Sequence, residues 1–226
     1  MGYVLATSRA WHEPMAARLQ EKLGRTVTLI NRKQDLKPQR LSSLDPRYVF
    51  FPHWSYIIPA EIYERYECVV FHMTDLPLGR GGSPLQNLIG RGIYETKLSA
   101  LRCVAEVDSG PVYLKRPLSL HGNAEEIYLR AGRLTEEIIL EIVNTNPHPQ
   151  PQTGEVRTFS RRKPSESRID RPQSLVKLFD HIRMLDAEGY PHAFVELDRF
   201  RYVFTRAAMK NGRIIADVEI TEAADE

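Results

Sequence analysis

The sequence predicts an α/β protein whose first and larger domain has a mostly parallel sheet, followed by a small α+β subdomain. In the first 146 of the 226 residues, short apolar runs alternate with segments of helical periodicity, which is typical of a sheet covered by helices. A proline-rich break then precedes one amphipathic helix and three strands. We therefore expect a larger domain at 1–146, a linker at 147–157 and a subdomain at 158–226.

Periodicity and turn residues locate the elements of the first domain. Residues 32–46 are polar and hold two prolines, so a loop with one turn of helix is expected there. Helices are expected at 14–23, 60–66, 83–90 and, capped by Asn123, up to Ile142. The expected strands are 3–6, 26–30, 48–51, 67–71, 96–104 and 111–114.

The subdomain is expected to hold a helix at 175–185 and strands at 193–197, 202–206 and 213–220. Asn211-Gly212 is a typical hairpin turn between the last two strands. These strands could pair across a two-fold axis, which predicts a homodimer, or their edges could be covered within the monomer.

Composition limits the class of protein. Hydrophobic residues make up 42% and charged residues 27%, as in globular proteins, and the net charge of +2 gives no sign of a nucleic-acid partner. No apolar run approaches the roughly 18 residues that span a membrane, and the amino terminus has no secretory pattern, so we expect a cytoplasmic protein without a membrane partner. Cys68 and Cys103 lie in apolar runs as buried thiols, and no metal-ligand spacing occurs.

Two polar residues follow apolar runs at positions suited to chemistry. His72 comes at the carboxyl end of a strand, where open α/β sheets bind ligands. Asp108 lies in a turn between two apolar runs, and its carboxylate could hold an imidazole in one tautomer and stabilise its protonated form. The alternative is that Asp108-Ser109-Gly110 is only a turn.

Three further segments are candidates for binding. The loop at 54–58 places large side chains where exposure is costly, so they either pack on the core or wall a flat ligand. Arg80 lies in a glycine-rich loop and is either a ligand contact or a solvated side chain. Arg9 follows the first strand and could meet a phosphate, although a solvated loop is the simpler interpretation.

Together these residues resemble the folate-dependent formyltransferases, a family that includes the methionyl-tRNA and sugar N-formyltransferases. The family's Asn-x-His-x-Ser-Leu-Leu-Pro segment corresponds to Val-Phe-His-Met-Thr-Asp-Leu-Pro at 70–77, and its Pro-Ile-Gln to Pro-Leu-Gln at 84–86. Its Asp-Thr-Gly turn corresponds to Asp-Ser-Gly at 108–110. Segments 167–170 and 190–194 are similar to motifs of its second domain.

The resemblance implies a Rossmann-like formyltransferase domain, N10-formyltetrahydrofolate as formyl donor and an amine as acceptor. His72 and Asp108 are then catalytic, while Val70 stands where the family has a catalytic asparagine. Asn87 is our first candidate to replace that amide, ahead of Thr74 and Asp75. The residues expected to border the folate are Trp54, Tyr56, Ile57, Ile58 and Val107. Those expected to bind the acceptor are Arg9, Trp11, Thr74, Arg80, Gly81 and Gly82.

The acceptor is predicted from charge and length. A tRNA is bound through many phosphate contacts, whereas the carboxyl-terminal part is short and has one small basic cluster, Arg161-Arg162-Lys163. This favours a nucleotide-linked amino sugar and a sugar N-formyltransferase. The alternatives are a methionyl-tRNA formyltransferase or a non-catalytic relative that binds folate or a nucleotide.

Overall fold

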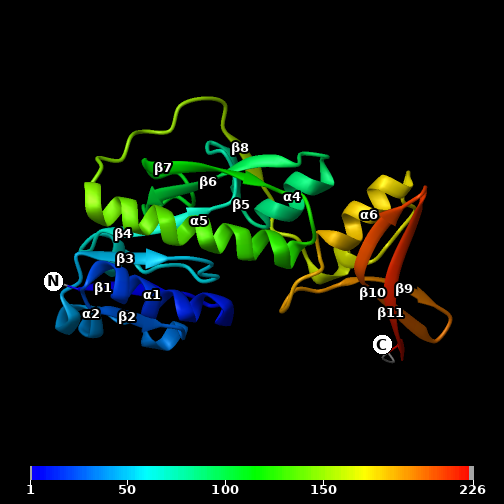
Figure 1. Ribbon diagram of the computed structural model, residues 1–226, viewed down its shortest axis with the longest axis horizontal. Coiled ribbons are helices and arrows are strands. Elements are labelled where there is room, and N and C mark those ends of the chain that lie inside the picture. Colours follow the sequence, from blue (N-terminus) through cyan, green and yellow to red (C-terminus); the bar gives the residue numbers. More distant parts are fainter. Residues whose placement is uncertain (1, 224–226) are drawn as a thin grey trace. The chain divides into compact units, whose positions relative to one another are not determined.

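The computed structural model describes residues 2–223, which form two compact units (Figure 1). The first contains the residues up to Gly81 together with Lys97–Leu118 and Leu129–Thr158. The second contains Gly82–Thr96, Ser119–Tyr128 and the residues from Phe159 onward. Each unit thus draws on separate parts of the chain, and the division into 1–146, 147–157 and 158–226 stays a prediction.

A six-stranded sheet with the order β2-β1-β3-β4-β6-β7 organises the first unit. β2, β1, β3 and β4 are parallel, whereas β6 runs antiparallel to β4. The strands are β1 (Tyr3–Ala6), β2 (Val27–Ile30), β3 (Tyr48–Phe51), β4 (Cys68–His72), β6 (Glu95–Arg102) and β7 (Val112–Ser119). The predicted mostly parallel, Rossmann-like α/β fold is confirmed.

The core follows the period of two along the strands. Val4, Ala6, Val49 and Phe51 pack in one buried cluster with Leu41 and Ile62 from two short helices. Their neighbours Leu5 and Phe50 are also buried and point to the opposite face. Because both faces are buried, the strands read as nearly continuous apolar runs, which is why the sequence locates them well.

The longest helix, α5, is joined to α1 by charged side chains. Glu136 accepts hydrogen bonds from Arg18 at 2.8 Å and Lys22 at 2.7 Å. The α-helices are α1 (Glu13–Leu23), α2 (Pro38–Leu44), α3 (Ala60–Tyr63), α4 (Pro84–Gly90), α5 (Ala124–Thr145) and α6 (Leu175–Arg183), and short 3-10 helices occupy Ala10–His12, Lys33–Asp35 and Pro164–Ser167. The segment at 32–46, expected to be a loop with one turn of helix, holds more helix than that: Pro38 is in the first turn of the seven-residue α2, where a missing N–H costs nothing.

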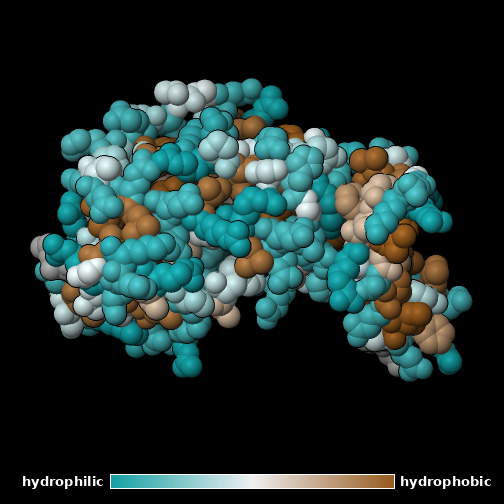
Figure 2. Space-filling view, in the orientation of Figure 1, coloured by the Kyte–Doolittle hydropathy of each residue, from teal (hydrophilic) through white to brown (hydrophobic). Residues whose placement is uncertain are grey.

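In the second unit, β9 (Ala193–Leu197), β10 (Phe200–Lys210) and β11 (Arg213–Glu222) form an antiparallel sheet in the order β11-β10-β9. Asn211 and Gly212 both have positive φ, as the predicted hairpin turn requires. Apolar side chains gather on the surface over β10 and β11, where Val218 and Ile220 are about half exposed (Figure 2). A homodimer stays a prediction. No helix within residues 2–223 is both long and apolar enough to cross a membrane.

The glycine-rich loop and the linker contain two short strands that the sequence did not predict. β5 (Leu78–Gly81) pairs with β8 (Arg157–Phe159) in a two-stranded sheet. Further back, Gln150 exchanges two backbone hydrogen bonds with Val112, at 2.7 and 2.8 Å. The linker is therefore bound along the first unit through its backbone.

Candidate active site

The structure brings His72 and Asp108 together in the first unit. His72 is the last residue of β4 and is buried, so its ring is held at the carboxyl end of a parallel strand. Asp108 lies in the turn between β6 and β7 with φ of +55°. Its Oδ2 is 3.4 Å from His72 Nδ1, which is within ion-pair distance when the ring is protonated.

Strand β5 contacts both members of this pair. His72 Nε2 is 2.7 Å from the carbonyl oxygen of Gly79. The backbone N–H of Gly81 donates to Asp108 Oδ2 at 2.9 Å. Both glycines have positive φ, 75° and 101°, which side-chain-bearing residues rarely adopt, so the glycines allow this close approach.

Both ring nitrogens of His72 face oxygen atoms. One ring nitrogen faces a carbonyl oxygen and the other a carboxylate, and both of these are hydrogen-bond acceptors. An imidazole and a carboxylate at this distance form a pairing suited to general acid–base work and to stabilising negative charge.

Gln152, from the linker, joins the two loops that contact the pair. Its Nε2 donates to the carbonyl oxygens of Asp108 and Gly110, each at 2.8 Å. Its Oε1 accepts from Arg80 Nε and Nη2 at 3.1 and 2.9 Å. No sequence pattern signals this residue, because these bonds span more than 40 positions of chain.

Val70 and Thr74 flank His72 on the chain. Val70 is on the same face of β4 as His72 and packs against the core cluster, so an amide is indeed absent there. Thr74 is fully buried, and its hydroxyl is 3.5 Å from Gly79 O. The hydroxyl of Ser99, which pairs with His72 across the sheet, donates to Thr74 O at 2.7 Å.

Asn87 lies on α4 in the second unit and is fully engaged there. Its Nδ2 is 3.0–3.1 Å from three carbonyl oxygens, those of Gly82, Ser83 and Ser160. Its Oδ1 accepts from Arg91. The amide therefore has no spare hydrogen in this structure. Gly82, in the same unit, donates from its backbone to Phe159 O at 3.2 Å.

The side chains expected to border the folate divide between core and surface. Ile58 is buried, whereas Ile57 and Val107 are exposed, at 79% and 56%. Trp54 contacts Tyr56 edge to face at 5.3 Å, and its buried Nε1 has no hydrogen-bond partner among the described residues. Exposed apolar side chains beside an orphaned donor fit a flat heterocycle with acceptor atoms.

Arg9 and Trp11 belong to an aromatic group in the first unit. The Arg9 guanidinium lies 5.3 Å from the Trp11 ring centre, and Trp11 meets His53 edge to face. His12 Nε2 is 3.0 Å from His53 Nδ1. Burial lowers the pKa of His12 to about 4 and that of His53 to about 3, so both rings are neutral at pH 7.

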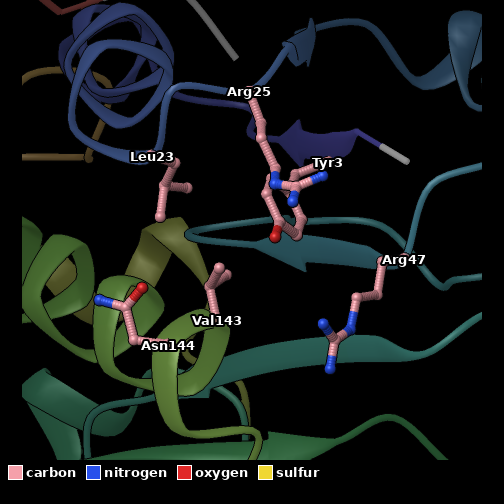
Figure 3. A pocket seen from close by; sticks show the side chains of 6 residues that line it. All are labelled: Tyr3, Leu23, Arg25, Arg47, Val143 and Asn144. Atoms are coloured by element: carbon pink, nitrogen blue, oxygen red, sulfur yellow. The ribbon is translucent and has the colours of Figure 1, made fainter.

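A hollow of about 430 Å³ opens at the opposite edge of the sheet (Figure 3). Tyr3 begins β1, while Arg25 and Arg47 precede β2 and β3, so this hollow is at the amino ends of the parallel strands. His72 is at a carboxyl end. Within residues 2–223 no group of three or more metal-ligating side chains comes together.

The geometry can be compared with known proteins. The family model described as "Methionyl-tRNA formyltransferase, C-terminal domain" matches residues 164–221. The methionyl-tRNA formyltransferase of Thermodesulfovibrio yellowstonii is 26% identical over 79% of this chain and 61% of its own length. The solved structure of methionyl-tRNA formyltransferase from Clostridium thermocellum is 48% identical, with a TM-score of 0.96, over 99% of this chain and 100% of that chain. This chain belongs to the folate-dependent formyltransferase family.

Other relatives differ from this chain in length or in sequence. The chain spans about half the length of most curated relatives it matches. A sugar N-formyltransferase from a Shewanella species covers the whole chain with a TM-score of 0.69 but is only 13% identical, which shows a shared fold alone.

The predicted sugar acceptor and the predicted absence of a nucleic-acid partner are therefore wrong. The overturning finding is the 48% identical Clostridium thermocellum chain, which is covered in full and is a methionyl-tRNA formyltransferase. The argument from length fails because the Clostridium thermocellum chain, which this chain covers in full, is a methionyl-tRNA formyltransferase. The argument from charge fails because +2 is an average over 31 basic and 29 acidic residues and says nothing about where they gather.

Proposed function

We propose that this chain transfers a formyl group from N10-formyltetrahydrofolate to the amino group of methionyl-tRNA. The observation that carries the proposal is the 48% identity to the Clostridium thermocellum methionyl-tRNA formyltransferase over nearly the entire chain. The pairing of His72 with Asp108 at a strand end supports it, because this is the chemistry that transfer to an amine needs.

The folate supplies an activated formyl group, and the chain's own residues do the rest. The His72 imidazolium donates a hydrogen bond to the oxygen on which negative charge develops as the amine attacks. Asp108 pairs with the ring and accepts the proton that the amine loses, directly or through water. The bond between the formyl carbon and N10 of the folate would then break, and that proton would pass to N10, so that tetrahydrofolate leaves with a neutral N10. For Nε2 to reach that oxygen it must exchange its contact with Gly79 O, and the positive-φ glycines of β5 make that adjustment possible.

The pterin ring is proposed to be bordered by Trp54, Tyr56 and Ile57. Val107, which directly precedes Asp108 in the sequence, is proposed to border it as well. Tyr56 and Ile57 are exposed, and covering them with a flat ring would remove apolar surface from water. The Arg80 guanidinium already bonds to Gln152 and lies within ion-pair distance of Glu106, so it is not assigned to binding of the tRNA.

The test is a formylation assay on charged tRNA. Purified protein is mixed with N10-formyltetrahydrofolate and methionyl-tRNA, and N-formylmethionine is measured by mass spectrometry after the ester is hydrolysed. Uncharged tRNA and free methionine are the acceptor controls. The proposal predicts turnover with methionyl-tRNA, none with the controls, and a large loss in His72→Gln. Absence of formylated product with a folate-binding, folded protein would refute it.

A further inference from the structure

We propose that Gln152 is a positioning residue that holds His72 and Asp108 at their observed distance and orientation by joining the two loops that contact them. The expected effect of Gln152 on the rate rests on the proposed formyl transfer. Its effect on the positions of the two loops rests on the contacts alone. No substrate contact is assigned to Gln152, which acts through its neighbours.

The side-chain amide of Gln152 is used completely. Both of its N–H donors go to carbonyl oxygens of the Asp108 turn, those of Asp108 and Gly110, at 2.8 Å. Its oxygen receives two donors of one guanidinium, at 3.1 and 2.9 Å. An amide with four satisfied bonds has one orientation, so the two loops are fixed relative to each other.

The first loop needs such support. Asp108 has φ of +55°, a conformation that residues with a side chain rarely adopt. Gly110 lies so close to the preceding strand that a Cβ there would be 1.9 Å from the carbonyl oxygen of Arg102. Bonds to the carbonyls of both residues hold the turn in the conformation that aims the Asp108 carboxylate at His72.

The second loop receives the same support through Arg80. Arg80 stands between Gly79, whose carbonyl faces His72 Nε2, and Gly81, whose N–H donates to Asp108. Glycines on both sides leave the backbone of this segment with much freedom. Fixing the Arg80 guanidinium therefore restrains this segment, and with it the bond from Gly81 N–H that orients the Asp108 carboxylate.

Gln152 is itself held from both directions along the chain. Gln150 is paired with Val112 by two backbone hydrogen bonds, and Arg157 N–H donates to Pro77 O at 3.3 Å. A Cβ on Gly154, between these anchors, would come within 3.8 Å of Pro77, so the segment passes close to that loop. The linker is thus anchored on both sides of Gln152.

The experiment compares three variants in the full-length chain. Gln152→Ala removes all four bonds. Gln152→Glu keeps an acceptor for Arg80 but removes both donors to the Asp108 turn. Gln150→Ala is the matched control, because among residues 2–223 the Gln150 side chain bonds only to the neighbouring His148 O, and its backbone pairing survives the substitution.

We expect Gln152→Ala to lower kcat for methionyl-tRNA formylation by about 10- to 100-fold, because small displacements of catalytic groups cost that much. KM should stay within about twofold and Gln150→Ala should match the parent. Gln152→Glu should resemble Gln152→Ala. A kcat within about threefold of Gln150→Ala in both folded variants would overturn the proposal, and so would failure of both to fold, which would show a structural role only.

A second readout requires no activity. The N–H of Gly81 is bonded to Asp108 Oδ2, so its hydrogen exchange reports whether β5 and the Asp108 turn stay in register. Gln152→Ala should accelerate this exchange by at least about tenfold, with Gln150→Ala unchanged. If exchange at Gly81 is unchanged in Gln152→Ala, the positioning role is refuted, whether or not the parent protein formylates tRNA. If exchange is accelerated but the parent protein formylates no tRNA, the positioning role is supported and only the proposed function is refuted.

Discussion

Replacing Asp108 by asparagine removes one charge from the site and almost nothing else. An asparagine oxygen can still accept the backbone N–H of Gly81, so the loop contact at 2.9 Å survives. The same oxygen position faces His72 Nδ1, so the asparagine oxygen also stays opposite the ring, and the amide nitrogen takes the place of Oδ1. The variant therefore has the same shape as the parent but lacks the negative charge beside His72 and the carboxylate base.

The size of the effect follows from the distance. Two unit charges 3.4 Å apart interact with roughly 5 kcal/mol at an effective dielectric constant of about 20. Dehydration of the partly buried carboxylate reduces this value, so it is an upper bound. General acid–base groups typically contribute a factor of about 10²–10⁴ to the rate, which lies within this upper bound. We expect kcat for Asp108→Asn to fall by about 10²–10⁴.

The assay is single-turnover formylation of methionyl-tRNA, with tRNA binding and urea unfolding measured on the same protein. Binding of the tRNA should change little, because the variant keeps the shape of the site, and urea unfolding shows that the variant is folded under the assay conditions. A folded Asp108→Asn protein with kcat within about threefold of the parent would refute the role given to the carboxylate.

Three further predictions concern other residues. Val70→Asn places an amide on the His72 face of β4, where the family has one, and should not abolish turnover; loss of turnover would mean that this chain cannot use that amide. Gly110→Ala should destabilise by at least about 1–3 kcal/mol in urea unfolding, because a Cβ would be 1.9 Å from Arg102 O; a stable variant would show that the turn can shift. Burial lowers the pKa of His12 from 6.5 to about 4, so the unfolded chain binds more protons between these pH values and stability falls as the pH drops. The free energy of unfolding should lose about 2 kcal/mol from this source between pH 7 and pH 5, and His12→Gln should lack that loss; an identical pH dependence in both proteins would contradict it.

The sequence was informative wherever local chemistry decides structure. The strands were found because their apolar runs are buried on both faces, and the hairpin because Asn211 and Gly212 suit positive φ. The pairing of His72 with Asp108 was expected from the family resemblance and not from the strand pattern, because β6 runs antiparallel to β4 and the two strands end at opposite edges of the sheet.

What the sequence did not reveal depends on contacts between distant positions. β5 has the composition of a flexible loop and becomes a strand only by pairing with β8. Gln152 lay in a segment whose prolines indicated a linker, and only the fold shows its amide between Arg80 and the Asp108 turn. The acceptor was mispredicted because net charge is a sum over the chain, whereas recognition depends on a local surface.

The most direct test of the central claim is a double-mutant cycle on the pair. Single-turnover formylation of methionyl-tRNA is measured for His72→Gln, Asp108→Asn and the double variant. If the two side chains act as one unit, the double variant should be about as slow as the slower single variant, since the second change removes nothing further. Rate losses that simply multiply would show that His72 and Asp108 act independently, which contradicts a mechanism in which the carboxylate works by keeping the imidazole charged.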